Sequence, residues 1–158
     1  MPSHSFSFRK ISPLDYNRGY LQLMAQLSIV NPQNISYQQF HNFIYSLGYN
    51  HQIVVIEEIN SNKIVGSITM IFEQKLIHDL GMVCHIEDVV TDKEFRGNGL
   101  GKALINFAIK VAKEKCCYKI ILDCNEDNSK FYEKCGFHQK EKQMALYLEK
   151  ASYPIPPE

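Results

Sequence analysis

The sequence predicts one mixed α/β domain built around a single sheet, spanning residues 1–150 and followed by a proline-rich tail at 151–158. Two observations favour this fold class. Apolar residues follow strand periodicity in some segments and helical periodicity in others, in the order strand, two helices, three strands, helix, strand, helix and strand. With 158 residues and no visible repeat or linker, the chain is also long enough to bury one substantial core.

The first half of the chain predicts a strand, two helices and three strands. Residues 6–11 alternate between apolar and polar side chains, which indicates the opening strand. One helix is expected between Asp15 and Leu27. A second is expected from Ser36, where the letters SYQQ match a capping box, and it should end before Gly48. Runs rich in β-branched residues predict three strands, at 52–59, 61–72 and 82–91.

The second half predicts two helices and two strands. Residues 100–115 carry one apolar stripe at helical spacing, which is typical of an amphipathic helix. Residues 118–124 indicate a short buried strand. A short helix at 128–136 should be capped by Asn128 and stop at Gly136, and residues 144–148 should form the last strand.

Composition limits the possible partners and compartment. Basic and acidic residues balance at 17 each, so charge gives no argument for binding nucleic acid or an anionic membrane. No signal-length apolar segment opens the chain, and no run of 18 apolar residues occurs. The five cysteines lack C-x-x-C spacing, which favours reduced thiols. We expect a soluble cytoplasmic protein with no membrane span.

The stretch EFRGNGLGKAL, residues 94–104, contains the main functional signal. It lies between a predicted strand and a predicted helix, where backbone N–H groups and the helix dipole favour an anion. A Walker loop fails here, because its first glycine would be Arg96 and its hydroxyl residue Ala103. A dinucleotide fingerprint fails because its third glycine would be Lys102. A glycine-rich turn without a ligand remains an alternative.

A third pattern, Arg-x-x-Gly-x-Gly, fits Arg96, Gly99 and Gly101. Following the acidic strand IEDVV, it resembles the acetyl-CoA pyrophosphate loop of the GNAT acetyltransferase superfamily. The segments HIEDVVTDKEFRGNGLGKALI, CYKIILDCNEDNSKFYEKCGF and FEQKLIH also closely resemble eukaryotic glucosamine 6-phosphate N-acetyltransferases, over roughly residues 15–137. The resemblance implies a mainly antiparallel sheet with helices on both faces, acetyl-CoA as cosubstrate, an amino-sugar phosphate as acceptor, and a homodimer.

The resemblance also implies a set of residues that bind acetyl-CoA. A bulge in the central strand should aim a backbone N–H, best assigned to Val89, at the thioester carbonyl, where it would stabilise the developing oxyanion. The full set comprises Val89, Val90, Arg96, Gly97, Asn98, Gly99, Leu100, Gly101, Lys102, Asn128 and Tyr132.

Four residues are candidates for the chemistry: Glu87, Asp88, Asp123 and Tyr132. Strand alternation places Glu87 and Asp88 on opposite faces, and a structural ion pair is the alternative reading of this acidic pair. Asp123 should end a buried strand, where a carboxylate is costly unless it is bonded. The resemblance assigns Tyr132 as the proton donor to the departing thiolate, with packing as the alternative. The choice of general base between Glu87 and Asp123 stays open.

The acceptor is expected to contact Ser28, Lys75, His78, Glu87, Asp88, Tyr118, Lys119 and Asp123, again by resemblance. One departure from the family stands out. In the family, the final strand usually carries an arginine that binds the sugar phosphate. In this chain, Leu146 and Tyr147 occupy the positions where that arginine is expected. Phosphate recognition should therefore depend mainly on Lys75 and Lys119. Cys84 and His85 have no partners at zinc spacing, so no metal is expected.

The leading hypothesis is therefore an enzyme that transfers acetyl directly from acetyl-CoA to the amino group of glucosamine 6-phosphate, in a ternary complex. Two alternatives remain. One is a GNAT enzyme for another small amine or a protein lysine, and the other is a catalytically silent module that binds CoA.

Overall fold

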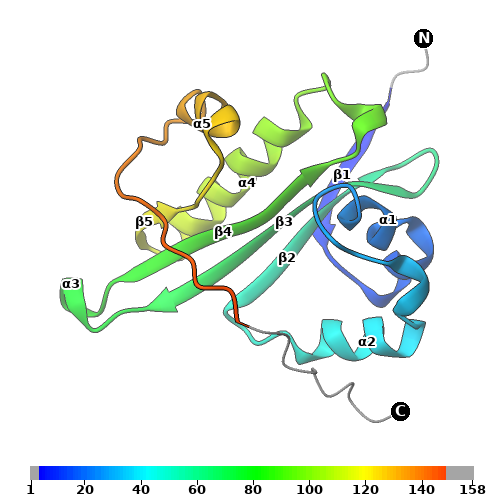
Figure 1. Cartoon of the computed structure of the whole chain (residues 1–158), viewed down its shortest axis with the longest axis horizontal. Helices are drawn as coiled ribbons and strands as arrows, with labels where there is room; N and C mark the ends of the chain where they lie inside the picture. Colours follow the sequence, from blue (N-terminus) through cyan, green and yellow to red (C-terminus); the bar gives the residue numbers. More distant parts are fainter. Residues whose placement is uncertain (1–3, 149–158) are drawn as a thin grey trace. The chain divides into compact units, whose positions relative to one another are not determined.

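The computed structural model of the chain describes residues 4–148 and divides it into two compact units, the first ending at Leu122 and the second beginning at Asp123 (Figure 1). The strands of the first unit are β1 (Phe6–Lys10), β2 (His51–Glu58), β3 (Lys63–Gln74), β4 (Met82–Thr91) and β5 (Cys117–Ile121). Its α-helices are α1 (Tyr20–Met24), α2 (Tyr37–Ser46), α3 (Ile77–Leu80) and α4 (Leu100–Glu114). Three 3-10 helices are η1 (Pro13–Arg18), η2 (Pro32–Asn34) and η3 (Lys93–Phe95).

The five strands form one sheet in the order β1-β2-β3-β4-β5. Neighbouring strands are antiparallel from β1 to β4, and only the β4–β5 pair is parallel. Short connections join β2 to β3 and β3 to β4, whereas η1, α1, η2 and α2 lie between β1 and β2. Helix α4 supplies the crossover that the parallel pair requires. The predicted mixed and mainly antiparallel sheet is confirmed.

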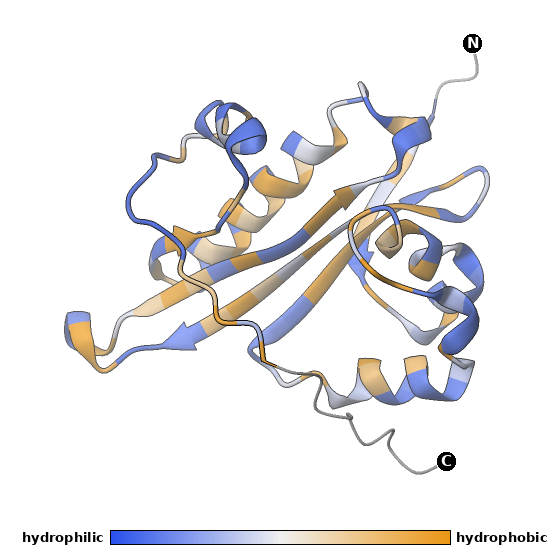
Figure 2. Cartoon of the chain, viewed as in Figure 1, coloured by the Kyte–Doolittle hydropathy of each residue, from blue (hydrophilic) through white to orange (hydrophobic). Residues whose placement is uncertain are grey.

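Helices cover both faces of this sheet. Residues 64–70 of β3 are buried without interruption, which requires cover on both sides. Residues of α1 and α2 form one core cluster with Ile53 and Val55 of β2. The intervening Val54 and Ile56 point to the other face, where α4 packs on β3 and β4 through Leu104. Figure 2 shows the apolar residues concentrated along the middle of the strands.

A buried ion-pair network joins β1, η1 and β2. The Arg9 guanidinium donates to both carboxylate oxygens of Asp15, at 2.9 and 2.7 Å, and to Glu57 at 2.7 Å. Asp15 has no solvent exposure and also accepts from the backbone N–H of Ser12. Arg18 donates to the other oxygen of Glu57 at 2.5 Å. The network therefore holds η1 against the ends of β1 and β2.

The predicted helix between Asp15 and Leu27 was wrong in extent. The segment forms η1 and α1, separated by Gly19, whose φ of 84° lies in the left-handed region that interrupts a helix. Leu27 lies beyond α1 and is exposed. The capping box at Ser36 is confirmed, since Ser36 accepts from the Gln39 N–H and the Gln39 side chain accepts from Ser36.

The three central strands and α4 formed as predicted, within two residues at each end. The prediction of a buried strand at 118–124 was only partly right. β5 ends at Ile121, and Tyr118, Lys119 and Ile121 are exposed, because β5 is an edge strand of the sheet. Within residues 4–148 no helix is long and apolar enough to cross a membrane.

The second unit contains α5 (Glu126–Glu133). Its cap is Asn125 rather than the predicted Asn128: the Asn125 side chain accepts from the Asn128 N–H at 3.0 Å. The helix ends three residues before Gly136, which has a φ of 93°. Residues 144–148 do not form the predicted strand, because a strand needs a neighbouring strand to complete its hydrogen bonds. The predicted tail at 151–158 lies outside the described residues.

We expect Asp15→Ala to destabilise the protein by about 3 kcal/mol, because it leaves the Arg9 guanidinium partly buried without its main partner. Urea unfolding would measure this loss. Glu114→Ala is the matched control: it removes an exposed ion pair with Lys110, 3.9 Å long, and should cost less than about 0.5 kcal/mol. Equal losses in the two variants would show that the Arg9 network does not stabilise the fold.

Candidate active site

A β-bulge interrupts β4 in the middle of the acidic segment. Ser67 of β3 pairs with Val90, but Thr69 pairs with Glu87. Two residues of β4, Asp88 and Val89, therefore lie opposite the single residue Ile68, which is the geometry of a bulge. The bulge expected in this strand is present at the expected residues.

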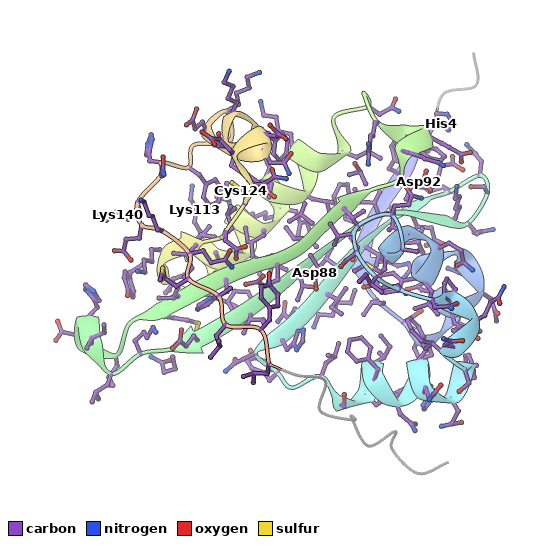
Figure 3. The ribbon with its side chains drawn as sticks, in the orientation of Figure 1. His4, Asp88, Asp92, Lys113, Cys124 and Lys140 are labelled. Carbon is purple, nitrogen blue, oxygen red and sulfur yellow. The ribbon has the colours of Figure 1, made fainter. Side chains whose placement is uncertain are left out.

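Asp88 enables the bulge by adopting a left-handed backbone, with a φ of 49°. Aspartate tolerates this conformation better than most residues. The predicted alternation across Glu87, Asp88 and Val89 was wrong, since the extra residue breaks the two-residue period. Asp88 is exposed, whereas Glu87 and Val89 are partly buried. Figure 3 marks Asp88 midway along β4.

Beyond its first four residues, β4 also loses its partner on the β5 side. The parallel pairing runs from Met82 with Cys117 to His85 with Ile121, where β5 ends. In the described part of the chain, no strand pairs with residues 86–91 of β4 on that side. An unpaired strand edge offers backbone N–H and C=O groups to an extended ligand. The bulge lies within this unpaired stretch.

The glycine-rich loop, residues 96–99, follows β4 after Asp92 and the short helix η3. Gly97 and Gly99 have φ values of 86° and 73°, and Asn98 fixes the turn by donating to the Phe95 carbonyl at 2.9 Å. Residues 96–99 are all exposed. The left-handed conformations explain why glycine occupies positions 97 and 99. Gly101 differs, because it lies inside α4 with a φ outside that region.

The N-terminus of α4 carries no side-chain cap. Gly99 occupies the N-cap position and has no side chain that could accept from the first-turn N–H groups. Leu100 is buried, whereas Lys102 in the same turn is exposed. Arg96 is also exposed and has no ion pair among residues 4–148. Free N–H groups, a helix dipole and two nearby cations are suited to a phosphate ligand.

Asp92 supports this loop, and the sequence analysis missed it. It is 2% exposed, accepts from the Glu94 N–H at 2.9 Å and pairs with Lys63 at 3.0 Å. Burial alone would raise the pKa of Asp92, but these contacts outweigh it and hold the pKa below its usual value. An aspartate directly after a strand, as here, is a capping signal that could have identified it.

Polar groups also lie beneath the bulge. Ser67 and Thr69 are buried in β3, and the Ser67 hydroxyl donates to the Tyr20 hydroxyl at 3.4 Å. Burial raises the pKa of Tyr20 to about 12, with the Asp88 and Asp15 charges adding to the shift. Tyr20 therefore keeps its proton at neutral pH next to the bulge. Tyr20 is the first residue of α1, directly after Gly19, and no motif in the sequence indicates a functional role for it.

Four of the predicted acceptor ligands gather where the β3–β4 connection meets β5. The His78 ring lies 4.3 Å from the Tyr118 ring, and Lys119 lies over the same tyrosine at 5.8 Å. The Lys75 N–H donates to the Gly81 carbonyl across the connection. The side chains of His78, Tyr118 and Lys119 therefore form one cationic and aromatic cluster, and the Lys75 backbone lies in the same connection.

Glu73 controls the orientation of Lys75 in this connection. One of its carboxylate oxygens contacts the Lys75 ammonium at 2.5 Å, and the other contacts His85 Nε2 at 2.8 Å. The Lys75 and His85 contacts lower the pKa of Glu73. Ser28, in contrast, lies in the exposed turn after α1. Because α1 and α3 lie at opposite ends of the sheet in Figure 1, Ser28 is not part of this cluster.

The second unit holds Asp123, Asn128 and Tyr132. Asp123 is exposed, so the prediction that it ends a buried strand was wrong; it follows β5 by two residues. Tyr132 is partly buried against Phe131 and Phe137. Burial, followed by Cys124, Cys135 and Asp123, raises the pKa of Tyr132. Its hydroxyl therefore remains a proton donor at neutral pH.

Comparison with known proteins identifies the family of this chain. Residues 20–137 match the Acetyltransferase (GNAT) family. The chain belongs to that family. It is 38% identical to a glucosamine 6-phosphate N-acetyltransferase of Arabidopsis thaliana over 93% of this chain and 99% of the relative, and 35% identical to one of Dictyostelium discoideum over 96% and 93%. The crystal structure of the Arabidopsis protein superposes with a TM-score of 0.87 at 37% identity, covering 92% of this chain and 99% of that one.

Membership in the GNAT family confirms two predictions, the fold and the acetyltransferase class of enzyme. In the described part of the chain, no group of three or more His, Cys, Asp or Glu side chains could hold a metal ion.

We expect Gly99→Val to weaken CoA binding at least about tenfold, because a β-branched side chain opposes a positive φ and blocks approach to the helix N-terminus. Gly48→Val is the matched control, since Gly48 lies in open space without a positive φ. Calorimetric titration with CoA measures both variants. Wild-type affinity in a folded Gly99→Val protein would exclude this loop as the phosphate site.

Proposed function

We propose that this protein transfers acetyl from acetyl-CoA to the amino group of glucosamine 6-phosphate, giving N-acetylglucosamine 6-phosphate for UDP-N-acetylglucosamine synthesis. The observation that carries the proposal is the β4 bulge at Asp88–Val89. It includes the second residue of the acidic pair and lies within the unpaired strand edge that leads to the uncapped end of α4. The names of the curated relatives from plants, amoebae and fungi support the substrate.

In this proposal acetyl-CoA lies along the unpaired edge of β4. Its pyrophosphate binds the N–H groups of residues 97–102, with Arg96 and Lys102 as cationic contacts. The pantetheine arm contacts the backbone of Val89 and Val90, and the Val89 N–H stabilises the negative charge that develops on the thioester oxygen. Asn128 and Tyr132 complete the set of acetyl-CoA contacts.

The chemical step is direct transfer within a ternary complex. Glu87 or Asp123 takes the proton of the sugar ammonium, directly or through water, and Asp88 contacts the same group. Tyr132 then donates a proton to the departing thiolate, whose thiol has a pKa of about 8.5. The raised pKa of Tyr132 suits this role. A cysteine intermediate on β4 is disfavoured, because burial raises the pKa of Cys84 to about 12 and keeps the thiol protonated.

Phosphate recognition in this proposal relies on lysine rather than arginine. Arg9 and Arg18 are occupied by Asp15 and Glu57, so neither is free to bind an anion. Lys119, with His78 and Tyr118 beside it, provides one cationic contact to the sugar phosphate. Lys75 provides the other by exchanging its contact with Glu73 for the phosphate. Asp123 contributes a carboxylate contact to the sugar. Ser28, which lies outside the cluster around Tyr118, stays a prediction from the sequence alone.

We propose a single acetyltransferase domain over residues 1–150 that acts as a cytoplasmic homodimer. The five cysteines are free thiols, as a reducing compartment favours. Met144, Leu146, Tyr147 and Leu148 are each more than 80% exposed. Such an apolar segment without a strand partner is suited to pairing with a second copy of the chain.

The test is thiol release from acetyl-CoA with glucosamine 6-phosphate, glucosamine and spermidine as acceptors. A strong preference for the phosphorylated sugar supports the proposal. Turnover of glucosamine and glucosamine 6-phosphate at equal efficiency would overturn the substrate assignment. Stabilisation by CoA without turnover of any amine would instead favour a silent binding module.

Lys119→Ala should raise the KM for glucosamine 6-phosphate about tenfold and reduce the preference over glucosamine, because a phosphate dianion loses one charged contact. Lys75→Ala should act in the same direction. Lys113→Ala, at an exposed position near the end of α4, is the control and should change neither value. If Lys119→Ala and Lys75→Ala both discriminate as well as the wild type, other residues hold the phosphate.

Tyr132→Phe should lower kcat by roughly 10²–10⁴-fold with small changes in the KM of either substrate, since the hydroxyl acts as charge develops on sulfur. Phe131→Leu, which alters the neighbouring packing, controls for a structural effect. Single-turnover kinetics would isolate the chemical step. An unchanged chemical rate in Tyr132→Phe would assign this tyrosine to packing alone.

A further inference from the structure

A cavity of about 450 Å³ lies between the α1–α2 layer and the face of the sheet that these helices cover. Most of its wall is apolar and comes from α1, α2, the segment that joins them and β2. The main contributors are Met24, Val30, Ile35, Phe40, Phe43 and Ile53. The volume falls within the range of small-molecule sites.

The polar groups of the cavity are few and lie mainly toward the sheet. Asp88 is its one carboxylate, and Gln39, His51 and Thr69 supply the other polar side chains apart from Tyr20. No lysine or arginine lines it. A phosphate ester would therefore find only the imidazole of His51 as a basic partner here. Of the residues proposed to contact the sugar phosphate, Asp88 alone belongs to this cavity.

The position of Asp88 connects the cavity to the proposed chemistry. Asp88 is the first residue of the bulge, and the next residue, Val89, carries the N–H proposed to hold the thioester oxygen. An ammonium that pairs with Asp88 would thus lie beside the acetyl group. The apolar walls would take up the remainder of that molecule, because burial of carbon surface favours it over water.

We infer that this cavity binds primary amines with an apolar body, such as 2-phenylethylamine, and that the protein acetylates them as a second class of acceptor. The charge complementarity supports this choice: one carboxylate, with no lysine or arginine in the wall, matches a monocation with an uncharged body. The inference rests on the acetyl-CoA binding of the proposed function, but not on the assignment of the sugar.

The reaction balances without any further reagent. The ammonium first loses a proton to Asp88 or to water, and the neutral nitrogen attacks the thioester carbonyl carbon. A C–N bond forms as the C–S bond breaks, and the sulfur leaves with its electron pair and takes up a proton. The second amine proton goes to solvent, so the products are the N-acetyl amine and CoA thiol.

The test uses the full chain with acetyl-CoA and compares 2-phenylethylamine with ethanolamine, which has the same amino group but no apolar body. Glucosamine 6-phosphate is assayed in parallel. We expect kcat/KM for 2-phenylethylamine to exceed that for ethanolamine at least about tenfold, because burial of one aromatic side group supplies a factor of this order.

Two lysine substitutions on α2 make the test specific to the cavity. Phe43 lines the cavity and is 45% exposed, whereas Tyr45 on the same helix lies outside it and is 72% exposed. Phe43→Lys places a positive charge at the wall and should raise the KM for 2-phenylethylamine at least about tenfold. Tyr45→Lys adds the same charge outside the cavity and should leave this KM within about twofold. Thermal melts confirm that both variants fold.

Each outcome separates the two assignments. Turnover of glucosamine 6-phosphate without turnover of 2-phenylethylamine would overturn the second acceptor class and leave the proposed function standing. The reverse result would support the inference and remove the sugar assignment. Two results would overturn the cavity as a separate acceptor site. One is an equal effect of Phe43→Lys and Tyr45→Lys on the KM for 2-phenylethylamine. The other is a loss of glucosamine 6-phosphate turnover in Phe43→Lys that matches the loss of 2-phenylethylamine turnover.

Discussion

The extra residue that β4 carries opposite Ile68 is the constraint on which the rest of the site depends. Because Asp88 and Val89 share one partner residue, the strand bends and its side chains lose their simple alternation. On its other edge, β4 continues beyond β5, whose pairing stops at Ile121. A regular ladder along the whole of β4 would occupy the backbone groups that an extended ligand needs.

The bulge is held in place by regular pairing on both of its sides. Ser67 pairs with Val90 and Gly66 with Thr91, and the Asp92 N–H donates to the Val65 carbonyl at 2.8 Å. The buried Asp92 side chain then shapes the start of the glycine loop through Glu94 and Lys63. One continuous set of contacts therefore runs from the core of β3 to the uncapped end of α4, and it fixes the loop without using the N–H groups that face outward.

Local patterns predicted most of the fold, because helices and central strands satisfy their own periodicity. The capping box at Ser36 and the strands of residues 51–91 are examples. The wrong predictions concern segments whose structure depends on more than their local apolar spacing. Residues 144–148 have strand-forming side chains but pair with no strand within residues 4–148. Gly19 divides a segment whose apolar spacing alone favours one helix. The loop and the acidic pair were found from sequence, whereas Asp92, Glu73 and Tyr20 were not, since their roles come from contacts across the sheet.

The first-turn N–H groups of α4 have no capping side chain, so a ligand that binds them also increases the fraction of folded protein. A molecule that binds only the folded chain stabilises it by mass action, by about 2.7 kcal/mol at a hundredfold excess over its dissociation constant. Gly99 provides no cap, so the free protein lacks an interaction that a capping side chain would supply. If acetyl-CoA fills this role, the chain is more resistant to unfolding and proteolysis when its cosubstrate is plentiful. The cellular level of the enzyme would then follow the supply of acetyl groups without any dedicated regulator.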